Sequence, residues 1–543
     1  MATFQQAIRQ VTADYLADDA CLTKTPEEIE GELLELTNAA IARHNRLTDD
    51  KGDTWPRKLN LEYAQIADIM MRLYDIRRIN CAGNATNEDY DLLGIYQTDG
   101  DDKGIYVTGE PVFRRVARSY CYGLDNRSIN EILVILKDSV PRVVRSQNRN
   151  LVAVNNGIFN YKTKELEPFS PDHVFLTKSR VDYVENPKNV VIHNDTDGTD
   201  WDVESWMQSL SDDPEIVNIL WELLSAIIRP NVRWNKSAWL YSNKGNNGKG
   251  TLCELMRSLC GEGSYASISI ADFGKDFLLE PLITASAIIV DENDVGSWID
   301  RAANLKAVIT NDVIQINRKH KQPIPYQFHG FMVQCLNDLP RIKDKSDSFY
   351  RRQLFIPMQK CFTGRERKYI KDDYLHRKEV LEYVLHKVLN TNFYQLSEPE
   401  ACKVSLEEYK MHNDPIRQFW GDFHDRFVWD AIPYTFLYSL YKSWYRRTAP
   451  EGKIYGKNQF IENLANVIYK DPDWAPVEKQ FRLHGEMRLP EPLIAEYELE
   501  DWYNPIAKSS KDINVKCTTT QVTKIRGIRR LAASPIVGGD DNA

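Results

Sequence analysis

Residues 239–251, which read WLYSNKGNNGKGT, constrain this chain more than any other stretch. Trp239 to Tyr241 are apolar and predict a strand. A polar loop with two glycines follows, and a helical pattern begins at Thr251. A glycine-containing loop between a strand and a helix lets backbone N–H groups surround an anion, while Lys249 reaches the terminal phosphates. The residues that we expect to contact a nucleotide are Gly245, Asn246, Asn247, Gly248, Lys249, Gly250 and Thr251.

The loop departs from the general pattern G-x-x-x-x-G-K-[ST] at two positions. Asn243 stands where the pattern has its first glycine, and Gly250 stands where it has a hydroxyl. Thr251 would therefore have to supply the contact to Mg²⁺. The alternative is that this stretch is a tight polar turn with an exposed lysine.

A second motif follows in residues 285–290 (ASAIIV), an apolar run that ends in Asp291-Glu292. In α/β folds, ligand chemistry lies at the carboxyl ends of buried parallel strands. We expect Asp291 to hold Mg²⁺ and Glu292 to polarise the attacking water. Without the glycine-containing loop, the same residues would be an ordinary strand end.

A third apolar run, residues 330–335 (GFMVQC), is followed by Asn337. An amide at a strand end beside a γ-phosphate can orient water without adding negative charge. Arg351 and Arg352 then precede another apolar run. Either arginine could reach the γ-phosphate of a neighbouring subunit, which requires a ring of subunits. The alternatives are that Asn337 begins a turn and that the arginines are solvated.

Between the second and third runs, residues 313–328 indicate a hairpin with a basic tip. A tip of this kind can grip phosphates in a central channel, although a solvated turn has the same composition. No second histidine stands at metal-ligand spacing from the histidine of the tip. The tip residues, which we expect to contact DNA, are Arg318, Lys319, His320 and Lys321.

Composition limits the remaining possibilities. A chain of 543 residues predicts two to four domains. The net charge of −9 argues against a wholly basic nucleic-acid coat but not against a local basic channel. Nine cysteines without a C-x-x-C pair disfavour a zinc ribbon and a disulfide framework. The start of the chain has no apolar signal region, and no stretch is long enough to span a membrane. We expect a cytoplasmic protein, which for a phage-encoded chain means the host cytoplasm.

Outside the motifs, the pattern is mainly helical. Residues 26–28 indicate a helix start, residues 64–78 a helix, residues 151–159 a hairpin, residues 213–228 a helix, and residues 399–404 a linker. We find no catalytic signature in residues 1–145.

The C-terminal region predicts three helices, over residues 415–427, 434–447 and 457–469, and then strands. This order fits a winged helix. Its aromatic residues could equally be core and its basic residues a solvated face. The candidate contacts to the DNA backbone are Tyr441, Lys442, Trp444, Arg446, Arg447, Lys453 and Lys457, and a second basic segment ends in Lys524, Arg526, Arg529 and Arg530.

The order and wording of these motifs resemble the superfamily 3 helicases, in particular the phage and plasmid group related to the poxvirus primase–helicase. The matching segments are NNGIFNYKTKELEPFSP, KGNNGKGT, IIVDEND, KAVITNDVIQINRKHKQP and CLNDLPRIKDKSDSFYRR. Asn311 stands where the group has glycine.

The resemblance implies an AAA+-like P-loop ATPase core within an α/β fold, a homo-hexameric ring, hydrolysis of ATP with Mg²⁺, and translocation on single-stranded or forked DNA. Further partners would be other replication proteins, such as a primase or a single-strand-binding protein. We expect a mixed, mainly helical N-terminal domain (1–195, with a poxvirus-helicase-like segment from about 150 to 195), a helical collar (200–235), the ATPase and helicase domain (236–395), a winged-helix-like DNA-binding domain (410–531) and a disordered tail (532–543).

The expected function is thus an ATP-dependent replicative DNA helicase of phage or mobile-element type. Three alternatives stay open at this stage. The chain could be a primase–helicase, although residues 1–150 show no zinc motif and no convincing pair of carboxylates. It could be an origin-binding initiator in which ATP only drives assembly. It could also be a P-loop signalling ATPase that does not act on DNA.

Overall fold

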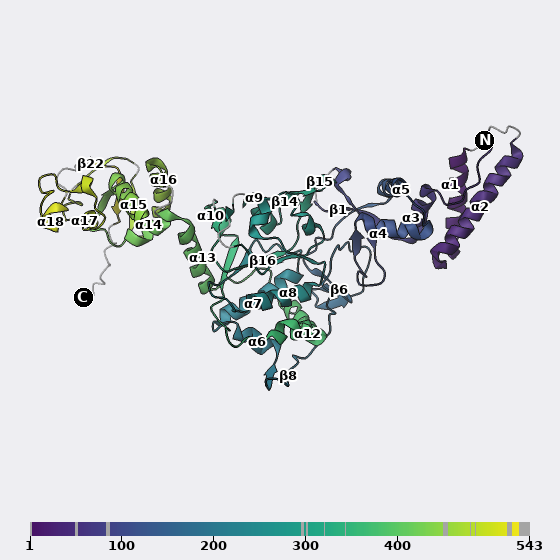
Figure 1. Cartoon of the computed structure of the whole chain (residues 1–543), viewed down its shortest axis with the longest axis horizontal. Coiled ribbons are helices and arrows are strands. Elements are labelled where there is room, and N and C mark those ends of the chain that lie inside the picture. Colours follow the sequence, from purple (N-terminus) through teal and green to yellow (C-terminus); the bar gives the residue numbers. More distant parts are fainter. Residues whose placement is uncertain are drawn as a thin grey trace, which may run out of the picture. The chain divides into compact units, whose positions relative to one another are not determined.

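A computed structural model of the chain describes residues 3–48, 53–82, 87–294, 298–299, 302–319, 321–342, 344–448, 454–477, 479–483, 485–518 and 524–531. The expected tail at 532–543 lies outside these residues. The chain forms two compact units, Met1–Ser405 and Leu406–Ala543, and each is a mixture of helices and strands (Figure 1). The expectation of a mixed α/β chain is confirmed. No helix among the described residues is both long and apolar enough to cross a bilayer.

The first part of unit 1 packs helices against a four-stranded sheet of order β3-β2-β1-β4. Helix α2 begins as the sequence predicts, with Pro26 in its first turn and a capping box between Thr25 and Glu28. The helix predicted over residues 64–78 is too long, because α3 ends at Leu73 and β1 begins at Ile76. The elements are α1 (Phe4–Leu16), α2 (Pro26–Leu47), α3 (Tyr63–Leu73), β1 (Ile76–Asn80), β2 (Leu92–Tyr96), β3 (Tyr106–Thr108), α4 (Glu110–Tyr120), α5 (Asn126–Ser139) and β4 (Arg142–Val144).

A small antiparallel sheet, β5-β6-β7, follows. Its strands are β5 (Leu151–Val154), β6 (Gly157–Asn160) and β7 (Glu165–Glu167). Because alternate strand residues point to opposite faces, Val152 and Val154 join the large central core while Leu151 and Ala153 pack with Ile105. The predicted hairpin is present, and it packs against both neighbouring parts of the unit.

The centre of unit 1 is a five-stranded parallel sheet of order β11-β12-β16-β10-β18. Its inner strands are almost fully buried, which explains why they are continuous apolar runs in the sequence. β16 lies between β10 and β12, so the three motif-bearing strands are neighbours, with the third motif in the middle. The strands are β10 (Ser237–Tyr241), β11 (Tyr265–Ala266), β12 (Ala287–Val290), β16 (Phe331–Leu336) and β18 (Gln353–Pro357).

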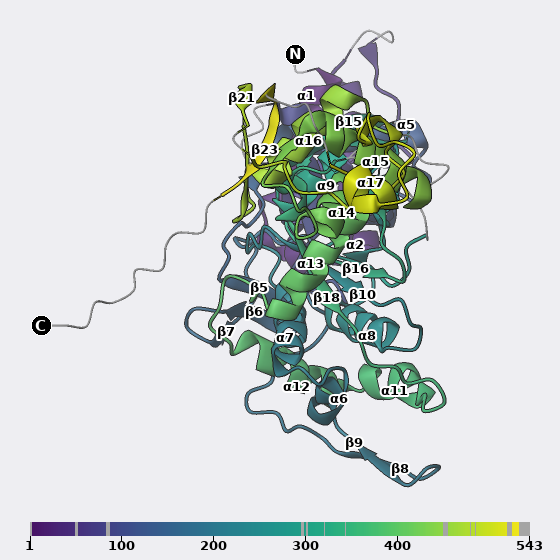
Figure 2. The same ribbon diagram turned by 90° about the vertical axis from the view of Figure 1, so that its left-hand side faces the viewer.

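Helices α7 (Pro214–Ile228) and α8 (Lys249–Cys260) pack near this sheet and share its core with α12 (Lys378–Leu389). In both whole-chain views, α6 (Val203–Ser209), α12 and the hairpin of β8 (Ile192–Asn194) and β9 (Thr199–Trp201) lie at one end of this region (Figures 1 and 2). Helix α9 (Ala302–Ile309) and the antiparallel pair β14 (Val313–Arg318) and β15 (Lys321–Gln327) lie at the other end.

Unit 2 has a core of its own, rich in tryptophan, tyrosine and phenylalanine. Its helices α14 (Pro415–Phe423), α15 (Tyr434–Thr448) and α16 (Lys457–Ile468) match the three predicted helices to within a few residues. A three-stranded sheet of order β19-β23-β20 completes it, with β19 (Ala431–Pro433), β20 (Trp474–Pro476) and β23 (Gly527–Arg530). The predicted linker at 399–404 is helical, because α13 (Glu400–Asn413) runs through it. The boundary between the two compact units lies directly after it, between Ser405 and Leu406.

Candidate functional site

The loop between β10 and α8 has a backbone that only a glycine allows at one position. Gly248 has a φ of +84°, and a Cβ at this position would lie 2.7 Å from Cδ2 of Leu210. Asn246 is also left-handed, with a φ of +52°, a conformation that asparagine tolerates better than most residues. Gly248 is the N-cap of α8 and has no side chain to cap the helix. The N–H of Lys249 donates to Oδ1 of Asn247 at 3.4 Å, and the N–H groups of Gly250 and Thr251 in the first turn are left for an anion.

Lys249 is the central side chain of the site. Only 5 % of it is exposed. Its Nζ donates to Oδ1 of Asn337 at 2.9 Å and to the carbonyl of Ser242 at 3.4 Å. Burial lowers the pKa of Lys249 below its usual value. Among the described residues no carboxylate pairs with this ammonium group. Burying an unpaired charge is unfavourable, and a bound anion would offset this cost.

Asp291 lies at the same edge of the sheet. Its Oδ2 is 3.9 Å from the position of a Cβ built on Gly250, so the carboxylate borders the first turn of α8. Arg257, on the same helix, pairs with it at 3.2 Å. Glu292 follows and is exposed. The sequence motifs thus bring Lys249, Asn337 and Asp291 to one edge.

Asn293 fixes the loop that carries the two acids, and the sequence reasoning missed it. Its Oδ1 accepts from the N–H of Ile270 at 2.9 Å. Its Nδ2 donates to Gln334 Oε1 and to the carbonyl of Cys335, both at 3.0 Å. The sequence signal for this role was an asparagine directly after the Asp-Glu pair. Its bonds tie the end of β12 to β16.

The residues fit Mg²⁺ in the way that nucleotide sites hold it. Mg²⁺ usually takes one or two protein oxygens and completes its shell with phosphates and water. Asp291 supplies a carboxylate next to α8, and Thr251 lies in the first turn of that helix. The described residues contain no cluster of three or more His, Cys, Asp and Glu side chains that could hold a metal by themselves. A site completed by phosphates is consistent with this.

A cavity of about 640 Å³ adjoins the loop. Gly248 and Thr251 form one wall, and residues from α6 and from the segment around α11 (Lys368–Asp372) form the others. The lining combines aromatic side chains with both cations and carboxylates. The aromatic side chains suit a flat base and the cations suit a charged phosphate chain. The residues are Asp200, Trp201, Asp202, Ser205, Trp206, Ser209, Leu210, Asn246, Gly248, Thr251, Phe362, Arg365, Glu366, Arg367, Lys368, Ile370, Lys371 and Asp372.

Lys371 is a further cation that sequence reasoning missed. Its Nζ lies 3.8 Å from a Cβ built on Gly250, at the start of α8. Lys371 belongs to α11, which lies far beyond α8 along the chain. The sequence pattern there indicated only a charged, helical region. Only tertiary packing brings it to the loop.

Arg351 and Arg352 are not near Lys249 in the same copy of the chain. They precede β18, whereas Lys249 follows β10, and the two strands are parallel neighbours. The length of a strand therefore separates the two sites. Arg351 is exposed, while Nη1 of Arg352 donates to Ser348 Oγ at 2.8 Å. The structure distinguishes the two arginines, which the sequence did not.

The basic tip joins β14 and β15, as the sequence predicts. Lys319 is exposed, and Lys321 pairs with Glu110 of α4 at 2.9 Å. The guanidinium of Arg318 donates to the carbonyl of Gln322 at 3.2 Å and 3.3 Å. His320 lies outside the described residues. The tip is therefore partly neutralised by the N-terminal part of unit 1.

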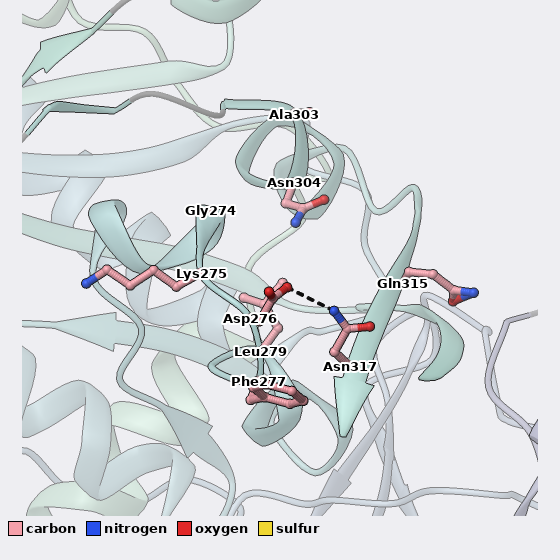
Figure 3. A pocket seen from close by; sticks show the side chains of 9 residues that line it. All are labelled: Gly274, Lys275, Asp276, Phe277, Leu279, Ala303, Asn304, Gln315 and Asn317. Carbon is pink, nitrogen blue, oxygen red and sulfur yellow. Dashed lines mark hydrogen bonds between the residues drawn. The ribbon is translucent and has the colours of Figure 1, made fainter. Parts of the chain in front are cut away.

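An exposed aromatic residue stands beside this hairpin, and the sequence gave no sign of it. Phe277 is 53 % exposed and has a left-handed φ of +66°, which is unusual for a bulky residue. Its loop is tied to β14 because Asn317 Nδ2 donates to Asp276 at 3.0 Å (Figure 3). An exposed ring next to basic side chains can stack on a nucleic-acid base.

Comparison with protein families gives matches in three separate segments. Residues 122–213 match the family described as D5 N terminal like, and residues 411–504 match the family described as Poxvirus D5 protein-like. The chain carries D5-like segments. Between them, residues 240–352 match a family of unknown function, DUF5906, whose match spans the glycine-containing loop, both acids and the basic hairpin.

Solved structures similar to this chain include three of the NrS-1 C terminal region. One covers 75 % of this chain and 85 % of its own, at 16 % identity and a TM-score of 0.41. The others cover 78 % and 97 % at 15 % identity and 0.44, and 87 % and 100 % at 14 % identity and 0.43. No curated protein sequence matches the chain.

Proposed function

We propose that this chain hydrolyses ATP with Mg²⁺ and uses the energy to move along single-stranded or forked DNA during replication. The observation that carries the proposal is the buried ammonium group of Lys249, which is bonded to Asn337 at the start of helix α8, where the first turn borders Asp291 and contributes Thr251 to the lining of a cavity that could hold a nucleotide. The D5-like segments support a primase–helicase type of role.

In this proposal the loop residues 245–251 surround the phosphates. Lys249 binds the terminal phosphates, and Thr251 and Asp291 hold Mg²⁺, which supplies charge neutralisation at the phosphate oxygens. Glu292 polarises the attacking water, and Asn337 positions it without adding negative charge. Trp201, Trp206 and Phe362 provide apolar surfaces for the base, and Lys371 adds a second contact to the phosphates.

Completion of the site requires a second copy of the chain. Arg351 is exposed at the opposite edge of the sheet from Lys249, so it can serve only a neighbouring subunit. Arg352 is engaged with Ser348 of its own chain. We therefore assign Arg351 as the arginine that stabilises the transferred phosphate, and a closed homo-hexamer as the assembly.

The hairpin tip and Phe277 would hold the DNA strand. Lys319 and Lys321 contact phosphates, and the ring of Phe277 stacks on a base. Binding of a strand would replace the ion pair between Lys321 and Glu110, in which each side chain is nearly half exposed. An exposed pair of this kind contributes at most about 1 kcal/mol, so phosphate can displace it.

The test is a forked-duplex unwinding assay with and without ATP, run beside an assay of hydrolysis stimulated by single-stranded DNA. Lys249→Ala should abolish both activities, whereas Lys188→Ala, which removes an exposed lysine elsewhere in unit 1, should change neither. Substantial hydrolysis by the Lys249→Ala protein would refute the site. Hydrolysis by the wild type that ignores DNA would favour a signalling ATPase, and ATP binding without unwinding would favour an initiator.

A further inference from the structure

Helix α8 has a glycine at its second position, Gly250, where the general loop pattern has a serine or threonine. In that pattern the hydroxyl contacts Mg²⁺ beside the carboxylate that follows the second motif strand. The nearest atoms that a Cβ at position 250 would meet are Nζ of Lys371 at 3.8 Å and Oδ2 of Asp291 at 3.9 Å. The space that a hydroxyl would occupy therefore borders the carboxylate that we expect to hold Mg²⁺.

Thr251 does not fill this space. Successive residues of an α-helix are turned by about 100° around its axis, so Thr251 and Gly250 face different directions. Thr251 lines the cavity next to the loop. Among the described residues, no hydrogen bond joins Thr251 to Asp291. The hydroxyl of Thr251 can reach a ligand in the cavity, but it does not hold the carboxylate in place.

Arg257 holds that carboxylate. Its Nη2 lies 3.2 Å from Oδ1 of Asp291, and its Nη1 donates to Oδ2 at 3.4 Å. Residues 250, 254 and 257 are spaced by four and three, so they share one face of α8, and helical side chains lean toward the N-terminal end of their helix. Arg257 therefore reaches back along the helix to the first turn, where the glycine leaves the face open.

The guanidinium of Arg257 is itself fixed from the other side. It lies 3.5 Å from Oε2 of Glu254, and His376 contacts Glu254 at 3.7 Å and Ser258 at 3.1 Å. The side chain of Arg257 is only 18 % exposed, so water screens its pairing with Asp291 less than at an open surface. A cation that is held in this way can fix the direction of a carboxylate.

We propose that Arg257 positions Asp291 for Mg²⁺ in place of the hydroxyl that Gly250 lacks. The inference rests on the proposed nucleotide site. Arg257 is a positioning residue, because it acts through Asp291. A carboxylate has about four lone-pair sites, so the two that face the guanidinium leave others for a metal ion. Removing a residue that holds a metal-binding side chain typically lowers metal affinity or activity by about 10- to 100-fold.

The experiment measures the affinity of the full-length chain for a fluorescent, non-hydrolysable ATP analogue, once with Mg²⁺ and once with EDTA. The quantity of interest is the ratio of the two affinities, because contacts to the nucleotide alone cancel in it. Arg257→Ala should lower this ratio by about 10- to 100-fold. Loss of the positive charge by itself would act the other way, since an unpaired Asp291 attracts Mg²⁺ more strongly. The direction of the change therefore separates positioning from charge.

Position 250 offers a rescue with a matched control. In the Arg257→Ala protein, Gly250→Ser adds a hydroxyl one bond beyond a Cβ that fits without a clash, so it can donate to Asp291 and should recover part of the ratio. Gly250→Ala in the same protein adds the Cβ alone and should recover nothing. Arg377→Ala removes a guanidinium from an exposed ion pair with Asp373 and should leave the ratio unchanged.

Melting temperatures show which variants are folded. If Arg257→Ala does not fold, Arg257→Lys keeps the charge but loses the two-pronged contact, and it should lower the ratio in the same direction. A wild type that binds no nucleotide would overturn the proposed site and this inference together. If the wild type binds more tightly with Mg²⁺, the site stands. An unchanged or higher ratio in the Arg257 variant, or equal recovery by serine and alanine at position 250, would then overturn the role of Arg257 alone.

Discussion

Gly248→Ala tests the loop conformation on which nucleotide binding depends. An alanine at a φ of +84° costs about 1–2 kcal/mol in the left-handed region. Its Cβ would also approach Cδ2 of Leu210 to 2.7 Å, and Leu210 is 1 % exposed, so its movement costs about a further 1 kcal/mol. The total of about 2–3 kcal/mol corresponds to a loss of about 30- to 150-fold in an equilibrium constant.

The free-energy cost of Gly248→Ala can lower either of two measured quantities, the affinity for nucleotide or the melting temperature. If the peptide leaves the left-handed region, the first-turn N–H groups of α8 turn away from the phosphates and the affinity for nucleotide falls. If the loop keeps its shape, the strain lowers the melting temperature of the protein instead. Titration with a fluorescent ATP analogue and calorimetry of the nucleotide-free protein therefore have to be read together, and their free-energy losses should sum to about 2–3 kcal/mol.

Gly263→Ala is the matched control. Gly263 has a φ of +80°, nearly the same as Gly248, but a Cβ there meets no atom within 4 Å and the residue lies past the C-terminal end of α8. It should lower the melting temperature and leave nucleotide affinity intact. The reasoning fails if Gly248→Ala binds nucleotide and melts like the wild type, or if Gly263→Ala loses the same affinity.

Three other predictions follow from the site and from unit 2. Arg351→Ala should reduce hydrolysis about a thousandfold with nucleotide affinity nearly unchanged. If neighbouring subunits share a site, a mixture of the Arg351→Ala and Lys249→Ala proteins should recover part of the activity. A mixture that stays inactive would contradict a shared site. Lys319→Ala combined with Lys321→Ala should weaken single-strand binding and lower the slope of log affinity against log salt concentration by about 1.4, while DNA-independent hydrolysis survives. Unchanged unwinding would show that the hairpin has no part in the mechanism. Burial raises the pKa of Glu491, which accepts from the N–H of Val428 at 2.9 Å. The stability contributed by its protonated form is complete below the unfolded value of about 4.3 and is lost as the pH rises through the raised folded value. Glu491→Gln should therefore flatten the pH dependence of the stability in calorimetry above about pH 4.3, and an unaltered pH profile would show that another group is responsible.

Local sequence signs predicted the elements of this chain well where they depend on near neighbours. The Thr25–Glu28 capping box, the apolar runs of β10, β12 and β16, and the three helices of unit 2 all follow from residues within one or two turns of each other. The failures are also local in origin. The helix predicted over 64–78 was too long because Ile76 continues the apolar spacing into β1, and the proline and serine near 399–405 concealed the start of α13.

The residues of the candidate site also form two groups, those that the sequence predicted and those that only the structure revealed. Asp291 and Asn337 were named from the sequence because each directly follows a strand of one parallel sheet, and Lys249 because it ends the glycine-containing loop after a third such strand. The carboxyl ends of these strands must meet at one edge. Lys371, Asn293 and Phe277 acquire their positions only through packing: a helix folded back on the loop, an asparagine bonded across to β16, and a loop tied to β14.

The sequence by itself therefore determined which side chains end each strand and begin each helix, since hydrophobic period, capping and glycine conformation act over a few residues. Only the tertiary structure decided which charges are neutralised and which are free. Arg351 and Arg352 are adjacent in the chain, yet one is exposed and the other bonds Ser348. Likewise, Tyr441 and Trp444 are buried in the core of unit 2, whereas Arg446 and Arg447 of the same helix are exposed. Exposure and pairing are set by contacts between distant segments, and no local pattern encodes them.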